Sequence, residues 1–178
     1  TMPVLNPATE TQVASVAMGN KDDVNDAVAA AKTAWETFSK TSKSERLELL
    51  RRLKNETEKR LEDLAQAMRI EMGAPISMAR EAQADAAVGH LGGFIEALKL
   101  LQSKKTLASG DIVLKEPIGV CGLITPWNWP INQIALKVIP ALATGCTCVL
   151  KPSEHTPISA MIYAEIIHEA GYPDGVFN

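Results

Sequence analysis

The chain has 178 residues, of which 46% are hydrophobic and 22% are charged, so it is long enough and apolar enough to bury a core. Its 18 lysine and arginine residues nearly balance 21 aspartate and glutamate residues, which argues against a nucleic-acid-binding protein. No apolar run approaches the ~20 residues that span a bilayer, and no secretory leader is recognisable. Three cysteines, an odd number, form no disulfide framework, so we expect a cytoplasmic protein without a membrane partner.

Charge is distributed unevenly along the chain and divides it into two parts. Residues 21–71 are dense in charges of both signs, which is typical of solvated amphipathic helices. Within 117–150, Lys137 is the only charged residue, a pattern typical of a buried parallel sheet. We therefore expect an α/β fold, with a mainly helical segment over 1–110 and a βαβαβ segment over 111–178.

Three long helices are predicted in the first segment. The first begins after Asn20, a favoured N-cap residue, and has two acidic residues in its first turn. The second follows Ser42 and Glu45, which are spaced as in a capping box. Its apolar stripe continues without interruption to Met72, and Gly73 ends it, so one helix of about seven turns is predicted.

The third predicted helix, over about residues 77–102, contains three poor helix formers, Gly89, Gly92 and Gly93. Their presence predicts either a closely packed neighbouring element or a bend in the helix. After this helix, the alternation of apolar and polar residues over 111–116 predicts a half-buried strand.

Strands and helices alternate in the last third of the chain. Continuous apolar runs over 118–125 and 146–150 have strand length, and 176–177 resembles the start of a third strand. Helical spacing over 131–144 and 157–170 separates them. This order predicts part of a Rossmann-like parallel sheet with right-handed crossovers.

Polar loops follow the first two of these strands. Ligands of open parallel sheets bind outside the carboxyl ends of the strands, so the loops over 125–128 and 151–154 are expected to line one crevice. Lys151 can donate to ribose or phosphate oxygens, and Glu154 can accept from ribose hydroxyls. Asn128 carries an amide donor that can stabilise an oxyanion. The residues alone therefore predict a nucleotide-binding half-sheet.

Several motifs, in order and in spacing, carry a family resemblance over nearly the whole chain. They are Asn-Pro-Ala-Thr at 6–9, Pro-Ile-Gly-Val at 117–120, Pro-Trp-Asn-Trp-Pro at 126–130, Pro-Ala-Leu-Ala-Thr-Gly at 140–145, and Lys-Pro-Ser-Glu at 151–154. With these motifs the chain resembles the NAD(P)-dependent aldehyde dehydrogenase superfamily. The resemblance implies oxidation of a small aldehyde to an acid: a cysteine thiolate attacks the carbonyl, hydride passes to nicotinamide, and a glutamate activates water.

The resemblance also implies roles for individual residues. Asn128 matches the asparagine that stabilises the oxyanion of the thiohemiacetal. The residues that match the cofactor site are Ile124, Thr125, Pro126, Trp127, Lys151, Ser153 and Glu154. The carboxylate of Glu154 would repel a 2′-phosphate and so favours NAD, whereas Ser153 beside it would relax that preference and leave NADP possible.

Parts of the family pattern are not found in the sequence. The family's second glycine-bearing cofactor turn, its general-base glutamate and its nucleophilic cysteine lie downstream of the position that matches Asn178, and its short strands before Asn6 are expected to be missing. We therefore expect the N-terminal part of a cofactor-binding domain, inactive alone and without the catalytic domain, from a homodimeric or tetrameric enzyme. The alternative is a truncated, non-catalytic nucleotide-binding or interaction module whose open sheet edge needs a partner.

The cysteines and two histidines have structural interpretations. Cys121, Cys146 and Cys148 lie in apolar strand runs and are predicted to be core residues, although a Cys-x-Cys pair on one strand face is an alternative for soft metal ligands. No spacing with His90 or His155 fits a zinc site, so no metal site is predicted. His155 is expected to be exposed at the rim of the crevice.

Without the Pro-Trp-Asn-Trp-Pro motif, Trp127 and Trp129 would be interpreted as core residues as readily as residues of a site. Lys151 alone would more often be a surface lysine, and Asn128 alone a turn former or helix cap. The two interpretations of each residue are tested by its exposure and its hydrogen bonds.

Overall fold

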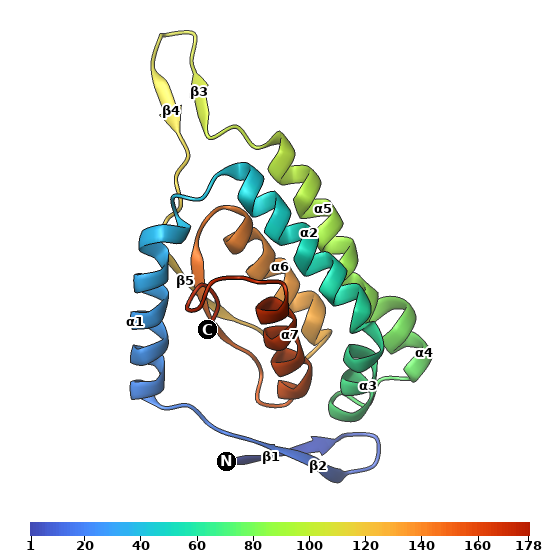
Figure 1. Cartoon of the computed structure of the whole chain (residues 1–178). Coiled ribbons are helices and arrows are strands. Elements are labelled where there is room, and N and C mark those ends of the chain that lie inside the picture. The colour runs from blue at the N-terminus through green and yellow to red at the C-terminus, as the bar shows by residue number, and fades with distance from the viewer.

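A computed structural model describes residues 1–178. Helices lie on both faces of a small parallel sheet, and two antiparallel hairpins project at opposite ends of the molecule (Figure 1). None of the helices combines the length and the apolar composition that a membrane-spanning helix requires.

The first two helices begin where the sequence predicts. α1 (Lys21–Phe38) has a capping box in which Asn20 accepts from backbone amides and Asp23 accepts from the Asn20 amide at 2.7 Å. α2 (Lys43–Lys59) has the predicted capping box of Ser42 and Glu45. Such caps stabilise a helix end by ~1 kcal/mol each, and both depend only on neighbouring residues.

The single second helix predicted from the apolar stripe is wrong. The helix breaks at Arg60, whose φ of −107° and ψ of 13° leave the helical region, and it continues as α3 (Leu61–Glu71). The Arg60 guanidinium pairs with Asp63 and lies 3.0 Å from Glu165 in a later helix. No glycine or proline marks this break, so local sequence does not predict it.

The third predicted helix contains three segments rather than one. α4 (Ile76–Met78) leads into a π-helical segment, η1 (Ala79–Ala84), and then into α5 (Asp85–Leu100). Of the two alternatives predicted at the three glycines, the close neighbour is absent, because a methyl group added to any of them would meet no atom of another element within 4 Å. The irregularity lies in η1, which precedes the glycines.

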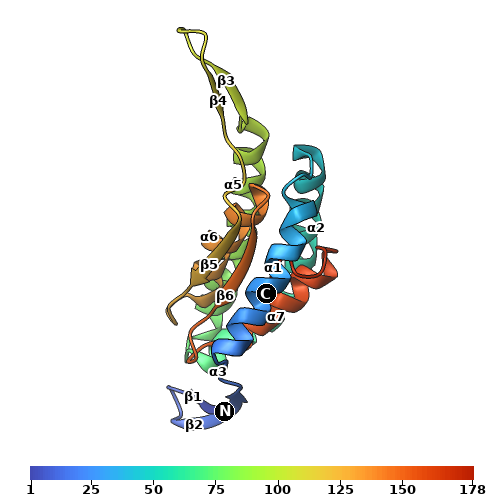
Figure 2. The same ribbon diagram turned by 90° about the vertical axis from the view of Figure 1, so that its left-hand side faces the viewer.

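Two hairpins were not predicted. β1 (Met2–Asn6) pairs with β2 (Thr11–Val16), so a strand does lead into Pro7, although the strands before Asn6 were expected to be missing. β3 (Lys104–Thr106) pairs with β4 (Ile112–Leu114). The half-buried strand expected at 111–116 is therefore shorter and exposed along its length, since it lies in a hairpin that projects from the body (Figures 1 and 2).

The alternation of strands and helices predicted after residue 117 is found. β5 (Val120–Ile124) is followed by α6 (Pro130–Ala143), β6 (Thr147–Lys151) and α7 (Pro157–Glu169). α1 covers one face of the strands, and α6 and α7 lie on the other, with α2 and α5 outside them (Figure 1). The view in Figure 2 looks past α1 onto the strands.

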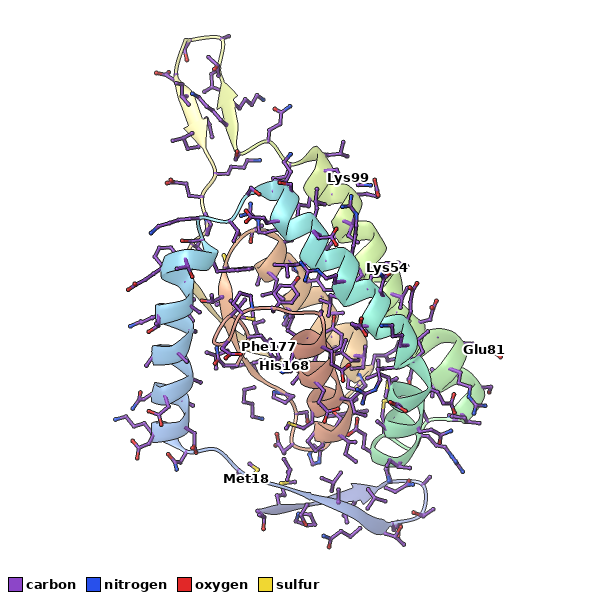
Figure 3. The ribbon with its side chains drawn as sticks, in the orientation of Figure 1. Met18, Lys54, Glu81, Lys99, His168 and Phe177 are labelled. Carbon is purple, nitrogen blue, oxygen red and sulfur yellow. The ribbon has the colours of Figure 1, made fainter.

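β6 is the middle strand of the parallel sheet. β5 pairs with it in parallel, and Cys148 forms a parallel bridge with Phe177 on its other side. The backbone amide of Asn178 donates to the Cys148 carbonyl at 3.0 Å, and the Asn178 carbonyl accepts from the Leu150 amide at 2.7 Å. The predicted third strand therefore begins here. Figure 3 shows Phe177 at the centre of the molecule, and it packs against the core.

The hydrophobic core lies between the sheet and its helices. Its fully buried large side chains come mainly from α2, α3, α6 and α7; they are Leu50, Leu53, Leu64, Met68, Ile131, Ile134, Ile139, Leu142, Tyr163 and Ile166, with Phe38 of α1 and Leu91 of α5. Lys54 of α2 and Lys99 of α5, both labelled in Figure 3, are instead partly exposed and form ion pairs with Glu58 and Glu96. This core holds both parallel strands in place, and so fixes where their carboxyl ends emerge.

Candidate functional site

The two predicted loops lie side by side. Ile124 and Lys151 are register partners at the carboxyl ends of β5 and β6. The Thr125 amide also donates to the Lys151 carbonyl at 3.3 Å, which extends the strand pairing into the loops. The segments 125–129 and 152–156 therefore leave the sheet at the same edge, where parallel sheets bind ligands.

Lys151 and Glu154 form the charged pair of this edge. Lys151 Nζ lies 2.7 Å from Glu154 Oε2, and the side chains are 59% and 35% exposed. The hydrogen bond from Lys151 holds the pKa of Glu154 below its usual range, so Glu154 is a carboxylate at neutral pH. Because an ammonium has three donors and a carboxylate two oxygens, both side chains keep capacity for a ligand.

Ser153 and Thr125 are buried, unlike the charged pair. Ser153 Oγ accepts from the His155 amide at 3.2 Å, and the Ser153 carbonyl accepts from the Thr156 amide at 3.2 Å. Ser153 therefore uses its polar groups to fold the loop. The structure brings both residues to the edge but does not expose their side chains as it does those of the charged pair.

Asn128 is exposed, and its side chain makes no hydrogen bond within the chain. It lies two residues before α6, which begins at Pro130. Trp129 between them has a φ of 53°, the left-handed region that is costly for a non-glycine residue. This strained residue joins the turn to the helix, and the exposed side-chain amide of Asn128 before it has no partner within the chain.

Apolar side chains are exposed beside these polar groups. Ile124 is 74% exposed and Trp127 is 56% exposed, and Pro126 between them is exposed as well. Trp127 is therefore no core anchor, whereas Trp129 is half-buried. Contiguous exposed apolar residues at a strand end are typical of a binding surface.

A groove of about 780 Å³ opens between this edge and the β1–β2 hairpin. Its lining comes from Trp127, His155 and Thr156 of this edge, from Glu71 and Met72 at the end of α3, and from residues 2–10 of the hairpin. His155 is exposed at its rim, as predicted. Glu71 was missed by sequence reasoning, because the groups that it contacts are 87 and 88 residues away in the chain.

The cysteines lie away from the exposed edge. Cys146 and Cys148 are buried, as predicted for core residues, while Cys121 is half-buried. Burial raises the pKa of Cys148 to about 12 and that of Cys121 to about 11, which keeps both as unreactive thiols at neutral pH. His90 Nε2 lies 2.7 Å from Asn132 Oδ1 and links α5 to α6.

Comparison with known proteins identifies the relatives of the chain. The model of the aldehyde dehydrogenase family matches residues 1–178. A 3-succinoylsemialdehyde-pyridine dehydrogenase from a Pseudomonas species is 49% identical over 179 residues, which cover 98% of this chain and 37% of that protein. The chain therefore spans just over a third of the length of this relative.

Solved structures agree with the sequence comparison. The crystal structure of an aldehyde dehydrogenase from Bartonella henselae matches with a TM-score of 0.97 and 47% identity, over 99% of this chain and 38% of that one. A mutant of aldehyde dehydrogenase C from Pseudomonas syringae, solved with NAD⁺ and octanal, matches with a TM-score of 0.96 and 48% identity, over 99% and 36% of the two chains. The predicted fold class and family resemblance are confirmed.

Proposed function

Because the chain belongs to the aldehyde dehydrogenase family, we propose that it is the N-terminal part of an enzyme that oxidises an aldehyde to a carboxylic acid with NAD. The observation that carries the proposal is the edge shared by β5 and β6. There, the charged pair of Lys151 and Glu154 lies beside the turn that carries Asn128. In this proposal, the loop after β6 binds the cofactor and the turn after β5 stabilises the oxyanion.

The charged pair fits the adenosine end of NAD. Lys151 can donate to ribose or phosphate oxygens, and the Glu154 carboxylate can accept from both ribose hydroxyls. Its negative charge disfavours a 2′-phosphate, so NAD is the expected cofactor and NADP the alternative. The exposed side chains of Ile124 and Trp127 offer apolar surface beside the pair. When bound, NAD supplies the hydride acceptor of the reaction.

Asn128 fits the oxyanion that develops when a thiolate attacks the aldehyde carbonyl. Its amide is exposed and unpaired, and the strained turn at Trp129 presents it at the start of α6. A preorganised donor of this kind lowers the barrier because it needs no rearrangement as charge develops. The attacking cysteine and the glutamate that activates water would come from the remainder of the enzyme.

Residues 1–178 would then form the N-terminal part of the cofactor-binding domain. The proposed boundary between its helical and βαβαβ segments, at residue 110, falls in the turn between β3 and β4. The full-length enzyme is expected to be a homodimer or a tetramer. Support for a longer protein comes from the coverage of the relatives, of which the chain matches 37%.

The experiment is an assay of NADH formation with an aldehyde, run on the full-length enzyme and on residues 1–178 alone. We expect NADH from the full-length enzyme and none from the isolated chain, because the nucleophile and base are supplied elsewhere. Reduction of NAD by the isolated chain would contradict the proposal. Lack of activity in the full-length enzyme with every aldehyde tried would favour a non-catalytic binding module.

A further inference from the structure

α7 begins without the local cap that α1 and α2 have. Those two helices each start with a capping box formed by neighbouring residues. Thr156, which precedes α7, makes no side-chain hydrogen bond to the helix, and the first turn of α7 contains no acidic residue. The free amides at the start of α7 therefore need an acceptor from elsewhere in the molecule.

Glu71, the last residue of α3, supplies that acceptor. Glu71 Oε2 accepts from the Ile158 amide at 2.6 Å, and Oε1 accepts from the Ser159 amide at 3.1 Å. The residue is only 2% exposed, so these amides replace water around the carboxylate. The positive end of the α7 dipole adds a favourable interaction with its charge. Glu71 thereby ties the start of α7 to the end of α3.

The start of α7 is also the end of the loop that carries the charged pair. Within this loop, the amides of His155 and Thr156 both donate to Ser153, each at 3.2 Å. The loop is thus a compact unit held at one end by β6 and at the other by α7. Since Glu71 fixes the α7 end, its loss would let the loop shift relative to β6.

We propose that Glu71 is a positioning residue, which holds the 151–156 loop through the N-terminus of α7 and so sets the affinity for NAD. The inference rests on the proposed function, in which this loop binds the adenosine ribose. The carboxylate of Glu71 binds the amides of Ile158 and Ser159 in α7, so Glu71 acts on the loop through the start of that helix.

The ionisation of Glu71 gives the inference a distinctive signature. Burial raises the pKa of Glu71 to about 7, against the opposing effect of its hydrogen bonds with Ser159 and Ile158. Below that pH the carboxyl is neutral and is a weaker acceptor for the two amides. Affinity for NAD should therefore fall as pH drops from about 8 to about 6. His155 and Glu10 are the other titratable groups that line this groove, and Lys151 keeps Glu154 ionised nearby.

The test uses Glu71→Gln in the full-length enzyme, with Glu62→Gln as the matched control. Glu62 lies on the same helix but is exposed and pairs with Arg80 rather than with α7. We expect Glu71→Gln to raise the dissociation constant of NAD about tenfold at about pH 8 and to flatten its pH dependence, with kcat at saturating NAD unchanged. Amide hydrogen exchange over 152–160, measured without NAD, should become faster in Glu71→Gln only.

A folded Glu71→Gln enzyme with parental NAD affinity and parental exchange over 152–160 would overturn the inference. If that variant does not fold, the parental enzyme and His155→Gln decide. Both should lose affinity for NAD between about pH 8 and about pH 6, and a flat profile in either of them contradicts the role of Glu71. Lys151→Ala separates the two proposals. If Lys151→Ala weakens NAD binding and Glu71→Gln does not, only the positioning role of Glu71 fails. If neither variant weakens NAD binding, the proposed cofactor site fails.

Discussion

The two ends of β6 differ in burial, polarity and expected role. Thr147 and Cys148 at the beginning of the strand are completely buried, and Thr147 Oγ1 donates to the Ala31 carbonyl of α1 at 2.9 Å. Lys151 at its carboxyl end is 59% exposed. One five-residue strand thus joins a region that holds the fold together to a region with free polar groups. Substitutions at the buried end should change stability, and those at the exposed end should change chemistry or binding.

The largest expected effect is on catalysis, from Asn128→Ala in the full-length enzyme. Loss of one oxyanion donor should slow acylation by about 10²–10³-fold, and the dissociation constant of NAD should not change. The pre-steady-state burst of NADH measures the acylation rate. Asn55→Ala, an exposed asparagine of α2, is the control and should behave as the parent. A parental burst rate in Asn128→Ala would remove the proposed role.

Gly175→Ala tests the buried end of the sheet and should lower stability without altering the site. Gly175 precedes the third strand with a φ of +78°, and an added methyl would lie 2.8 Å from the Ala30 carbonyl oxygen. We expect a loss of about 2 kcal/mol or more in the free energy of unfolding, measured by urea denaturation.

Gly110→Ala is the control for this variant. Its φ is +91°, but an added methyl would meet nothing within 4 Å, so only the backbone cost of about 1–2 kcal/mol is expected. Equal losses in the two variants would show that the close approach to α1 does not matter.

Lys151→Ala tests the exposed end and should weaken NAD binding about tenfold, because one charge-assisted hydrogen bond is removed. Its free energy of unfolding should change by less than about 0.5 kcal/mol, since exposed ion pairs stabilise little. Calorimetric titration with NAD and urea denaturation measure the two quantities. Lys54→Ala, which removes an exposed pair with Glu58 on α2, should leave NAD binding intact.

Thr147→Val is the mildest of these changes and affects only the buried end. The substitution conserves shape but removes the hydrogen bond to Ala31, so the unfolding free energy should fall by about 1 kcal/mol. NAD affinity and the acylation rate should stay at parental values. A change in NAD affinity would show that the two ends of β6 are coupled.

Features that depend on neighbouring residues could be predicted from the sequence. The N-cap at Asn20, the capping box at Ser42 and the alternation of strands and helices after residue 117 involve residues close in the chain, and all are found. The pairing of the two loops followed from parallel topology alone.

Features that depend on distant contacts could not be predicted. The apolar stripe continues through Arg60, yet the helix breaks there and Arg60 pairs with α7. The hairpin strand β3 has three exposed residues and no apolar pattern. Glu71 lies in an ordinary amphipathic helix, and its partners are amides of a helix 87 and 88 residues later.

The most direct test of the account is the NADH burst of the full-length enzyme, measured over a range of NAD concentrations for Lys151→Ala and Asn128→Ala. We predict that saturating NAD restores the parental burst rate in Lys151→Ala but leaves Asn128→Ala slow at every concentration. That result would assign binding to one strand end and oxyanion stabilisation to the other. A Lys151→Ala burst that stays slow at saturating NAD, or an Asn128→Ala burst that NAD restores, would contradict the account.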